Sequence, residues 1–371
     1  MKRKCTLLIT YSCNLNCVYC YEKHKSHVSM DVITAKNIIT QEMMFVANSE
    51  KYDSLDFHFM GGEPLLRFDL IKEVCEWTWS QNFGIPYHFY IITNGTLFTD
   101  QIKHWFEHNR DLITVDMSVD GIDVVHQTNR GCSSKQLPIE WVLTNWPKSR
   151  FKMTVSSQCI THFAESIITL THQGYNISST PALGEEWDQS HLALYAKEWD
   201  KIVDHFLGFN NTAIWSQLLQ SIDSLYDTGY VQDKCCGSGD AFITYDTNGE
   251  KYPCVIFTPL VWGLDIREKI ETIDFTNIEL FSDSACHNCF IKNMCKTCYG
   301  FNLKERGNLF ERDKRSCNIK KIELLFVCKF QSNILQRITH RPLTTKENIR
   351  LRQSSEAFYI LTQELSSILS L

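Results

Sequence analysis

The sequence predicts an α/β protein in which a partial, TIM-like (β/α)6 barrel is followed by a small cysteine-rich α+β domain. Short strand-like apolar runs alternate with helical stretches from about residue 5 to residue 185, which is typical of a parallel sheet covered by helices. No GxGxxG follows the first run, so an open barrel fits better than a dinucleotide-binding fold. Nine of the 16 cysteines lie between Cys235 and Cys328, which predicts the second domain.

The elements of the barrel can be placed in order along the chain. A helix is expected over 32–48, with Asp31 near its cap, and two more over 66–79 and 99–108. Strands are expected over 6–10, 56–60, 87–93, 113–118, 153–160 and 176–180.

Four regions follow from this reading. They are a barrel over 1–185, a helical linker over 186–234, the cysteine-rich domain over 235–330 and a helical C-terminal tail over 331–371. Within the third region, two strand-like runs flank Asn248-Gly249. Asn-Gly supplies the positive φ angles of a tight turn, so a hairpin is expected from residue 241 to residue 256.

Composition excludes several classes of protein. The chain has 371 residues, with 37 Lys and Arg against 43 Asp and Glu, so a nucleic-acid partner is not expected. No apolar run approaches the roughly 18 residues that cross a bilayer, and the N-terminus has no signal-peptide pattern. We therefore expect a cytoplasmic protein without a membrane partner. Disulfides are rare in that compartment, so the many cysteines are expected to bind metal.

The first cysteine motif directly follows the first predicted strand. Cys13, Cys17 and Cys20 form a CxxxCxxC spacing. Three thiolates on one tight loop can hold three irons of a [4Fe–4S] cluster and leave the fourth iron open for chemistry. A zinc site with a distant fourth ligand is the alternative, because thiolates also select zinc.

A second cysteine array lies downstream. Two Cys-x2-Cys pairs, Cys286 with Cys289 and Cys295 with Cys298, are separated by five residues. Alone, these pairs could form the two knuckles of a zinc ribbon. Further cysteines flank the pairs at 235, 236, 254 and 317.

The first motif resembles the signature of the radical S-adenosylmethionine (SAM) enzymes, including the aromatic residue, Tyr19, just before the last cysteine. The resemblance implies that Cys13, Cys17 and Cys20 hold a [4Fe–4S] cluster whose open iron binds the amino and carboxylate groups of SAM. One electron from that cluster cleaves SAM to methionine and a 5′-deoxyadenosyl radical, which abstracts hydrogen from the substrate.

Other positions match motifs that contact SAM in this family. Gly61-Gly62-Glu63-Pro64 matches a stretch that holds the amino group, and Arg130 matches an arginine that pairs with the carboxylate. Asn94 and Ser118 end the third and fourth predicted strands and match contacts to the methionine or ribose part. Taken singly, Asn94-Gly95 is also an ordinary turn and Arg130 an ordinary surface charge. The residues expected to contact SAM are Tyr19, Gly61, Gly62, Glu63, Asn94, Ser118 and Arg130.

The second array is similar to the SPASM extension of radical SAM enzymes, which carries two auxiliary [4Fe–4S] clusters. One departure is the two residues between Cys295 and Cys298, where three are typical. The resemblance implies a first auxiliary cluster on Cys236, Cys254 and Cys298, to which Cys235 could add a ligand or replace Cys236. It implies a second cluster held by Cys286, Cys289, Cys295 and Cys317. Three [4Fe–4S] clusters and SAM are thus the expected cofactors.

Most relatives with this extension modify a peptide or a protein side chain. We therefore expect a peptide maturase that abstracts hydrogen from a ribosomally made precursor peptide and forms a thioether or carbon–carbon crosslink. The alternative is anaerobic sulfatase maturation by formylglycine formation, whose enzymes carry an aspartate after the hairpin cysteine. Here Val255 follows Cys254, and valine accepts no proton, so a base would come from elsewhere. Asp120 and Glu185 are the preferred base candidates, followed by Asp123 and Asp188.

The expected partners follow from the same resemblance. They are the precursor peptide and an external one-electron donor such as flavodoxin or ferredoxin. Only four residues precede Cys5, so no N-terminal leader-binding module is expected. Leader recognition would then use 186–234, the C-terminal tail or a separate protein. A different class stays open, namely a non-catalytic iron–sulfur or zinc scaffold that binds a partner protein.

Overall fold

The computed structural model of the chain describes residues 1–208, 213–227 and 234–370. The chain forms two compact units, each assembled from three separate segments. The first unit comprises Met1–Val119, Arg130–Phe151 and Cys236–Ile278, and the second comprises Asp120–Asn129, Lys152–Cys235 and Glu279–Leu371. Among the described residues, no helix has the length and apolar content that crossing a membrane requires.

The first unit is built on a mostly parallel sheet, in the order β4-β3-β2-β1-β7-β8. The neighbours from β4 to β7 pair in parallel, and only β7 and β8 are antiparallel. The predicted α/β class with parallel strands is confirmed. The strands are β1 (Lys2–Thr10), β2 (Ser54–Gly61), β3 (Tyr87–Thr93), β4 (Ile113–Ser118), β7 (Phe242–Tyr245) and β8 (Lys251–Tyr252).

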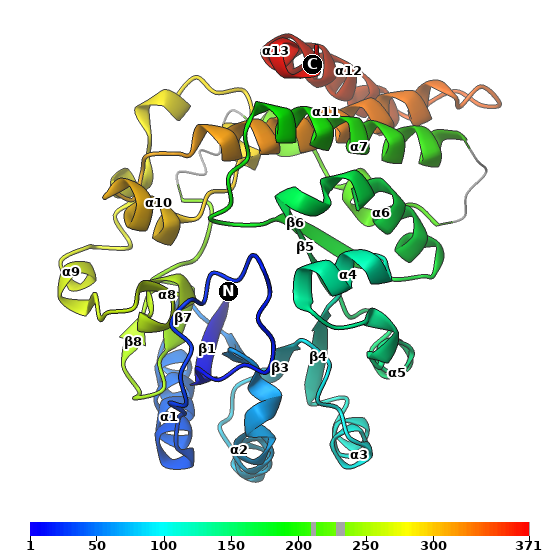
Figure 1. Ribbon diagram of the computed structural model, residues 1–371. Helices are drawn as coiled ribbons and strands as arrows, with labels where there is room; N and C mark the ends of the chain where they lie inside the picture. The colour runs from blue at the N-terminus through cyan, green and yellow to red at the C-terminus, as the bar shows by residue number, and fades with distance from the viewer. Residues whose placement is uncertain (209–212, 228–233, 371) are drawn as a thin grey trace. The chain divides into compact units, whose positions relative to one another are not determined.

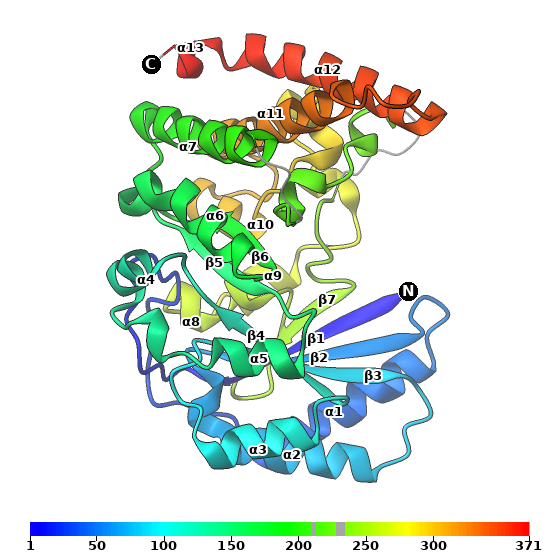
Figure 2. The same cartoon turned by 90° about the vertical axis from the view of Figure 1, so that its right-hand side faces the viewer.

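One face of this sheet is covered by α1 (Val32–Ala47), α2 (Phe68–Ser80) and α3 (Asp100–His108) (Figure 2). Alternate strand residues point to this face, and three of them, Phe57, Phe59 and Phe89, are fully buried. The Phe89 ring stacks on both other rings with centroids 5.4 Å apart. Asp31 caps α1, because its carboxylate accepts a hydrogen bond from the Thr34 N–H at 2.8 Å. The smaller helices of this unit are α5 (Ile139–Asn145), α8 (Pro259–Trp262) and α9 (Arg267–Glu271).

The second unit holds the neighbouring strands β5 (Phe151–Val155, apart from its first residue) and β6 (Ile177–Pro181). In Figure 1, α11 lies between α7 and α12, and the three helices form a layered stack. Trp199 and Trp215 are buried in its core with ring centroids 5.0 Å apart. The helices are α4 (Asp123–Arg130, whose last residue belongs to the first unit), α6 (Phe163–His172), α7 (Gln189–Gly208), α10 (Tyr299–Arg306), α11 (Lys314–Gln336), α12 (Thr345–Glu364) and α13 (Ser366–Leu369).

Most predicted strands agree with the structure within a few residues, and one does not. The strand predicted over 153–160 is wrong beyond Val155, because Ser157–His162 is a 3-10 helix. The backbone N–H of Ser157 donates to the Glu185 carboxylate at 2.7 Å. This side-chain acceptor replaces a neighbouring strand as the partner and ends the extended run.

The predicted hairpin around Asn248-Gly249 is present, with a second strand of only two residues. Its first strand, β7, also pairs in parallel with β1, where Thr6 lies opposite Thr244. The hairpin therefore extends the main sheet. The four-region division of the chain stays a prediction.

Candidate active site and metal centres

The three-cysteine motif lies in an irregular loop between β1 and α1. Cys13, Cys17 and Cys20 are half-buried and form no disulfide. The loop is ordered by its own hydrogen bonds, in which the Cys20 N–H donates to the Cys17 carbonyl at 3.1 Å and the Leu15 N–H donates to the Cys13 sulfur at 3.5 Å. The spacing predicted three thiols on one tight loop at the end of the first strand, and the loop has this form.

The glycine pair at the end of β2 sets this loop in place. The N–H of Gly62 donates to the Thr10 carbonyl at 3.0 Å, and the N–H of Glu63 donates to the Ser12 carbonyl at 2.8 Å. A Cβ on Gly62 would lie 2.4 Å from the Ser12 oxygen and 2.8 Å from Cys13 Cβ. Glycine lets two backbones approach closely, and here the backbone of Gly62 approaches that of the cysteine loop.

Glu63 is buried and accepts three hydrogen bonds. They come from Leu65 N at 3.0 Å, Thr93 Oγ1 at 2.6 Å and Asn94 N at 2.8 Å. Burial raises the pKa of the Glu63 carboxyl, while these hydrogen bonds and the charge of Arg130 oppose that rise. The side chain joins the ends of β2 and β3.

Asn94 connects the end of β3 to the cysteine loop. Its amide nitrogen donates to Asn14 Oδ1 at 2.9 Å, and its amide oxygen accepts from Thr96 N and Thr96 Oγ1. Asn14 in turn donates to Thr96 Oγ1 at 2.8 Å. With these bonds, Asn94 fixes the loop that carries the three thiols.

Arg130 and Tyr19, two more of the predicted SAM contacts, lie side by side. Arg130, at the end of α4, is buried, and its guanidinium carbon lies 5.6 Å from the centre of the Tyr19 ring. This is within the range of a cation–π contact. Ser118, at the end of β4, is half-buried and makes no hydrogen bond within the described part of the chain.

A buried carboxyl in the cysteine loop was missed by the sequence reasoning. Glu22 lies two residues after Cys20 and is 8% exposed. Burial raises the pKa of Glu22 to about 8, against the opposing charge of Lys25. No motif signals this residue, and only its place beside Cys20 could have drawn attention to it.

A row of polar side chains across the sheet was also missed. Thr244, Thr6, His58, Tyr90 and Thr114 are register partners on successive strands. They point to the face opposite the helix-covered phenylalanines. The His58 and Tyr90 rings stack with centroids 4.9 Å apart. The signal was available, because buried parallel strands normally read as continuous apolar runs.

The two base candidates lie in the second unit, close to a cysteine. Asp120 is fully buried and accepts a hydrogen bond from Thr154 N at 2.9 Å, and Glu185 accepts from Ser157 N. Burial raises the pKa of Cys159, and the charges of Asp120 and Glu185 add to that rise. Cys159 therefore lies within electrostatic range of both carboxylates, which are already bonded to backbone N–H groups.

Four cysteines of the second array gather in the second unit. Burial raises the pKa of Cys295 to about 12 and that of Cys317 to about 11, and the charges of their cysteine neighbours, Cys286 and Cys289 among them, add to both rises. These four half-buried thiols lie within electrostatic range of one another, and metal would hold them as thiolates. Among residues 1–208, 213–227 and 234–370, however, no three His, Cys, Asp or Glu side chains are arranged to hold a single metal ion. The assignment of an iron–sulfur cluster to these four cysteines therefore rests on the thiolate donors that they supply and on their spacing in the sequence.

The remaining cysteines of the array fall in both units. Cys236 is exposed and Cys254 is half-buried in the first unit, and Cys298 precedes α10 in the second. Cys235 lies beside the 295–298 segment, because its sulfur accepts a hydrogen bond from Thr297 N at 3.3 Å. Its own N–H donates to Tyr299 Oη at 2.8 Å.

Val255 stands where an aspartate would mark sulfatase maturation. Its side chain packs against the buried cluster of Leu8, Tyr11 and Leu260. Tyr11 donates to both carboxylate oxygens of Asp246 at 2.7 Å. The position after Cys254 therefore contributes packing beside the loop and offers no base.

Comparison with known families agrees with the loop geometry. Residues 7–137 match the model of the radical SAM superfamily. These residues therefore form a radical SAM domain, and the chain is similar over most of its length to a radical SAM cyclopropyl synthase. That domain implies a [4Fe–4S] cluster and SAM, and the predicted family and enzyme class are confirmed.

Two curated relatives illustrate the range of this family. The chain is 23% identical over 368 residues to the radical SAM cyclopropyl synthase TigE of Paramaledivibacter caminithermalis, covering 89% of this chain and 75% of that protein. It is 32% identical over 124 residues to a serine-type anaerobic sulfatase-maturating enzyme of Bacteroides thetaiotaomicron, covering 32% of this chain and 29% of that protein.

Two solved structures share the fold. One is native anSMEcpe with bound AdoMet, with a TM-score of 0.67, 17% identity, and coverage of 92% of this chain and 99% of that one. The other is SuiB of Streptococcus suis bound to the precursor peptide SuiA, with a TM-score of 0.56, 16% identity, and coverage of 85% and 76%. At this identity, the likeness shows the fold.

Proposed function

We propose that the protein is a radical SAM peptide maturase that crosslinks a ribosomally made precursor peptide through a thioether or a carbon–carbon bond. The observation that carries the proposal is the second set of gathered thiols, Cys286, Cys289, Cys295 and Cys317, in a chain that also has a radical SAM domain. The fold of SuiB, solved with its precursor peptide, supports a peptide substrate.

The cofactor sites follow from the donor sets. Cys13, Cys17 and Cys20 would hold the cluster that, with SAM bound, supplies the 5′-deoxyadenosyl radical. We assign one auxiliary cluster to the four gathered thiols and another to Cys236, Cys254 and Cys298, with Cys235 as a further or replacement ligand. The contact of Cys235 with Thr297 supports that last role.

The protein residues have distinct proposed tasks at this site. Arg130 and Ser118 would bind the carboxylate and the ribose of SAM, and Tyr19 would pack beside them. Gly61, Gly62 and Glu63 would hold the amino group of SAM and Asn94 its methionine or ribose part, and the same residues would keep the cysteine loop in place. Asp120 or Glu185 would accept the proton that the substrate releases, and their closeness to Cys159 supports a shared polar site.

Sulfatase maturation is the second candidate. The matched segment of the Bacteroides thetaiotaomicron enzyme favours it, whereas the packing of Val255 removes the expected base. Both candidates need an external electron donor such as flavodoxin or ferredoxin. The cytoplasmic location and the lack of a nucleic-acid partner stay predictions.

Anaerobic reconstitution tests the proposal directly. The protein should bind about twelve irons, three clusters of four, and with dithionite convert SAM to 5′-deoxyadenosine. Incubation with a cysteine-bearing peptide encoded beside its gene should then yield a crosslinked product by mass spectrometry. Formylglycine on a sulfatase peptide would favour the second candidate. Zinc in place of iron, or intact clusters without SAM cleavage, would instead indicate a non-catalytic scaffold.

A further inference from the structure

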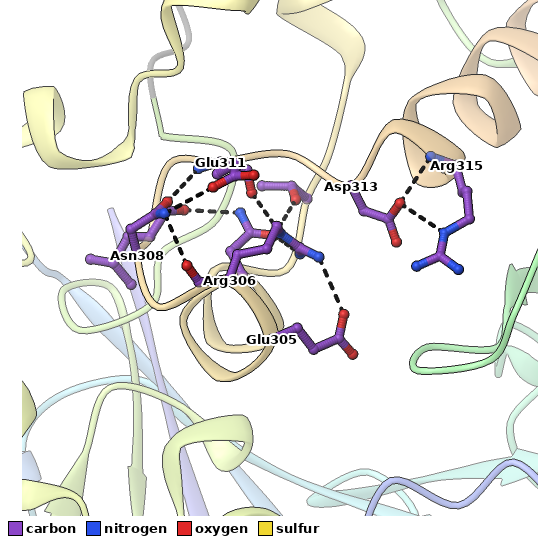
Figure 3. A network of polar contacts seen from close by, with 9 residues as sticks. Glu305, Arg306, Asn308, Glu311, Asp313 and Arg315 are labelled. Atoms are coloured by element: carbon purple, nitrogen blue, oxygen red, sulfur yellow. Dashed lines mark hydrogen bonds and ion pairs between the residues drawn. The ribbon is translucent and has the colours of Figure 1, made fainter.

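Arg312 is a half-buried cation, and two of its nitrogens lack a hydrogen-bond partner within the described residues. It lies between α10 and α11, and its Nε and Nη1 atoms are buried and unpaired within the described residues. The other two arginines of this segment do have partners (Figure 3). Arg306 donates to the Glu311 carbonyl and to Asn302 Oδ1, and Arg315 donates to the Asp313 carboxylate.

The loop around Arg312 is held by a dense set of hydrogen bonds. Asn302 donates to the Leu309 carbonyl at 2.9 Å, and Glu311 N donates to Asn308 Oδ1 at 2.8 Å. The N–H of Arg312 itself donates to Asp283 Oδ2 at 3.2 Å. An ordered backbone therefore places the guanidinium. In this position its Nε and Nη1 atoms have no hydrogen-bond acceptor among the described residues.

The contacts of Arg312 lead to the cysteines on two sides. Its guanidinium carbon lies 5.6 Å from the centre of the Tyr299 ring, and Tyr299 accepts the N–H of Cys235. Asp283, which holds the Arg312 backbone, also accepts the N–H of Cys286 at 2.8 Å. Cys317 follows five residues later, in the first turn of α11.

Electrostatics agrees with this placement. Burial opposes the charge of Arg312, yet the pKa of Arg312 is raised by Tyr299 and by Cys235, Cys286 and Cys295. A buried N–H group without an acceptor costs free energy, and Arg312 has such groups at Nε and Nη1 within the described residues. Four thiolates around a cluster carry net negative charge, so the metal-bound state would supply the missing counter-ion.

We propose that Arg312 is the counter-cation of the auxiliary cluster on Cys286, Cys289, Cys295 and Cys317, and that its positive charge makes this cluster easier to reduce. The inference rests on the proposed auxiliary cluster. The reduced cluster carries one more negative charge than the oxidised cluster. A nearby cation in a medium of low dielectric constant therefore stabilises the reduced form more strongly. Arg312 acts through the cluster and is therefore a positioning residue.

The test uses the full chain with Cys13, Cys17 and Cys20 all changed to alanine, so that only auxiliary clusters are observed. This background should retain about eight irons. Midpoint potentials are then measured by dithionite titration with electron paramagnetic resonance. In R312Q, the ratio of reduced to oxidised cluster at the parent midpoint should fall about tenfold, which is 59 mV for a one-electron couple.

Two further variants separate charge from packing. R315Q removes one positive charge from the same segment, at a side chain that is 48% exposed, and should leave the midpoint unchanged. R312K keeps the charge without the planar fork and should keep its iron, with less than a threefold change in the same ratio.

The outcomes distinguish the two proposals. A background variant without iron would overturn both the auxiliary clusters and the role of Arg312. Iron with equal midpoints in R312Q and R315Q would overturn the role of Arg312 alone. If R312Q loses its iron, the R312K variant decides between charge and packing. Iron retained in R312K would support the role of the charge. Iron lost in R312K as well would show that the site needs the packing of the guanidinium, and would overturn that role.

Discussion

At the scale of single residues, the carboxylate of Glu63 shows how a ligand motif can serve the scaffold. The Gly-Gly-Glu-Pro stretch predicts contact with SAM, and Glu63 also accepts three hydrogen bonds from the ends of β2 and β3. The residue types and their places at the strand ends could be predicted from the sequence. The bonds of Asn94 to Asn14 could not, because they join side chains 80 positions apart.

Changing Glu63 to glutamine should destabilise the metal-free protein. The amide places an N–H donor against a backbone or hydroxyl donor, and a buried unmade hydrogen bond costs about 1–3 kcal/mol. Urea unfolding followed by circular dichroism should show a lower midpoint. Glu50→Gln, at an exposed position, is the control, and equal midpoints for the two variants would contradict the role assigned to Glu63.

The carboxylate of Glu347 should make stability depend on pH in acid. Hydrogen bonds from Arg341 and from Thr344 lower the pKa of Glu347 to about 2. Since the pKa is depressed in the folded state, the stabilisation is present above the ordinary value near 4.5 and is lost as pH falls toward 2.

This dependence can be measured with Glu347→Gln. The difference in thermal midpoint between parent and variant should be largest at pH 5 and should shrink as pH falls to 2.5. Glu271→Gln is the matched control, since Glu271 is exposed and has no ion pair in the described chain. A difference that stays constant over this range would argue against the depressed pKa.

At the scale of elements, the local sequence pattern predicted which helices and strands exist better than it predicted which strands pair with one another. The turn at Asn248-Gly249 predicted a hairpin, and the hairpin is there. Its pairing with β1 is a long-range contact that no local signal carries. The wrongly predicted strand beyond Val155 has the same cause, since the acceptor for Ser157 comes from Glu185, 28 residues further along the chain.

The glycine at the end of β2 should tolerate no side chain. In Gly62→Ala, the new Cβ would meet the Ser12 carbonyl and Cys13 Cβ, so the cysteine loop must move away from β2. Overpacking of this kind costs about 1–3 kcal/mol. Iron reconstitution should fall from about twelve to about eight per chain.

Gly208→Ala is the control for that variant, because a Cβ there meets no atom of the described residues within 4 Å. It should reconstitute like the parent protein. Full iron content in Gly62→Ala would show that the loop accommodates the added methyl group.

At the scale of the whole molecule, the two cysteine sets should separate into two functions. Cys17→Ala should abolish cleavage of SAM to 5′-deoxyadenosine, because it removes a ligand of the radical cluster. Cys295→Ala should retain part of that cleavage and give no crosslinked peptide. Chromatography of the nucleoside and mass spectrometry of the peptide measure the two steps.

The buried Cys75, which lies outside both sets, provides the control for these variants. Cys75→Ala should keep both steps at near the parent rate. Peptide crosslinking by Cys295→Ala at the parent rate would show that the reaction does not need the second cysteine set.

The pairing of β7 with β1 has a consequence for folding during synthesis. β1 leaves the ribosome first, yet β7 begins at residue 242 of 371. At ordinary elongation rates, one edge of β1 stays bare for on the order of tens of seconds, and bare strand edges recruit other chains. A fragment truncated after residue 185 never receives its capping strand, so most of it should pellet on centrifugation of a lysate in which the intact polypeptide stays in the supernatant.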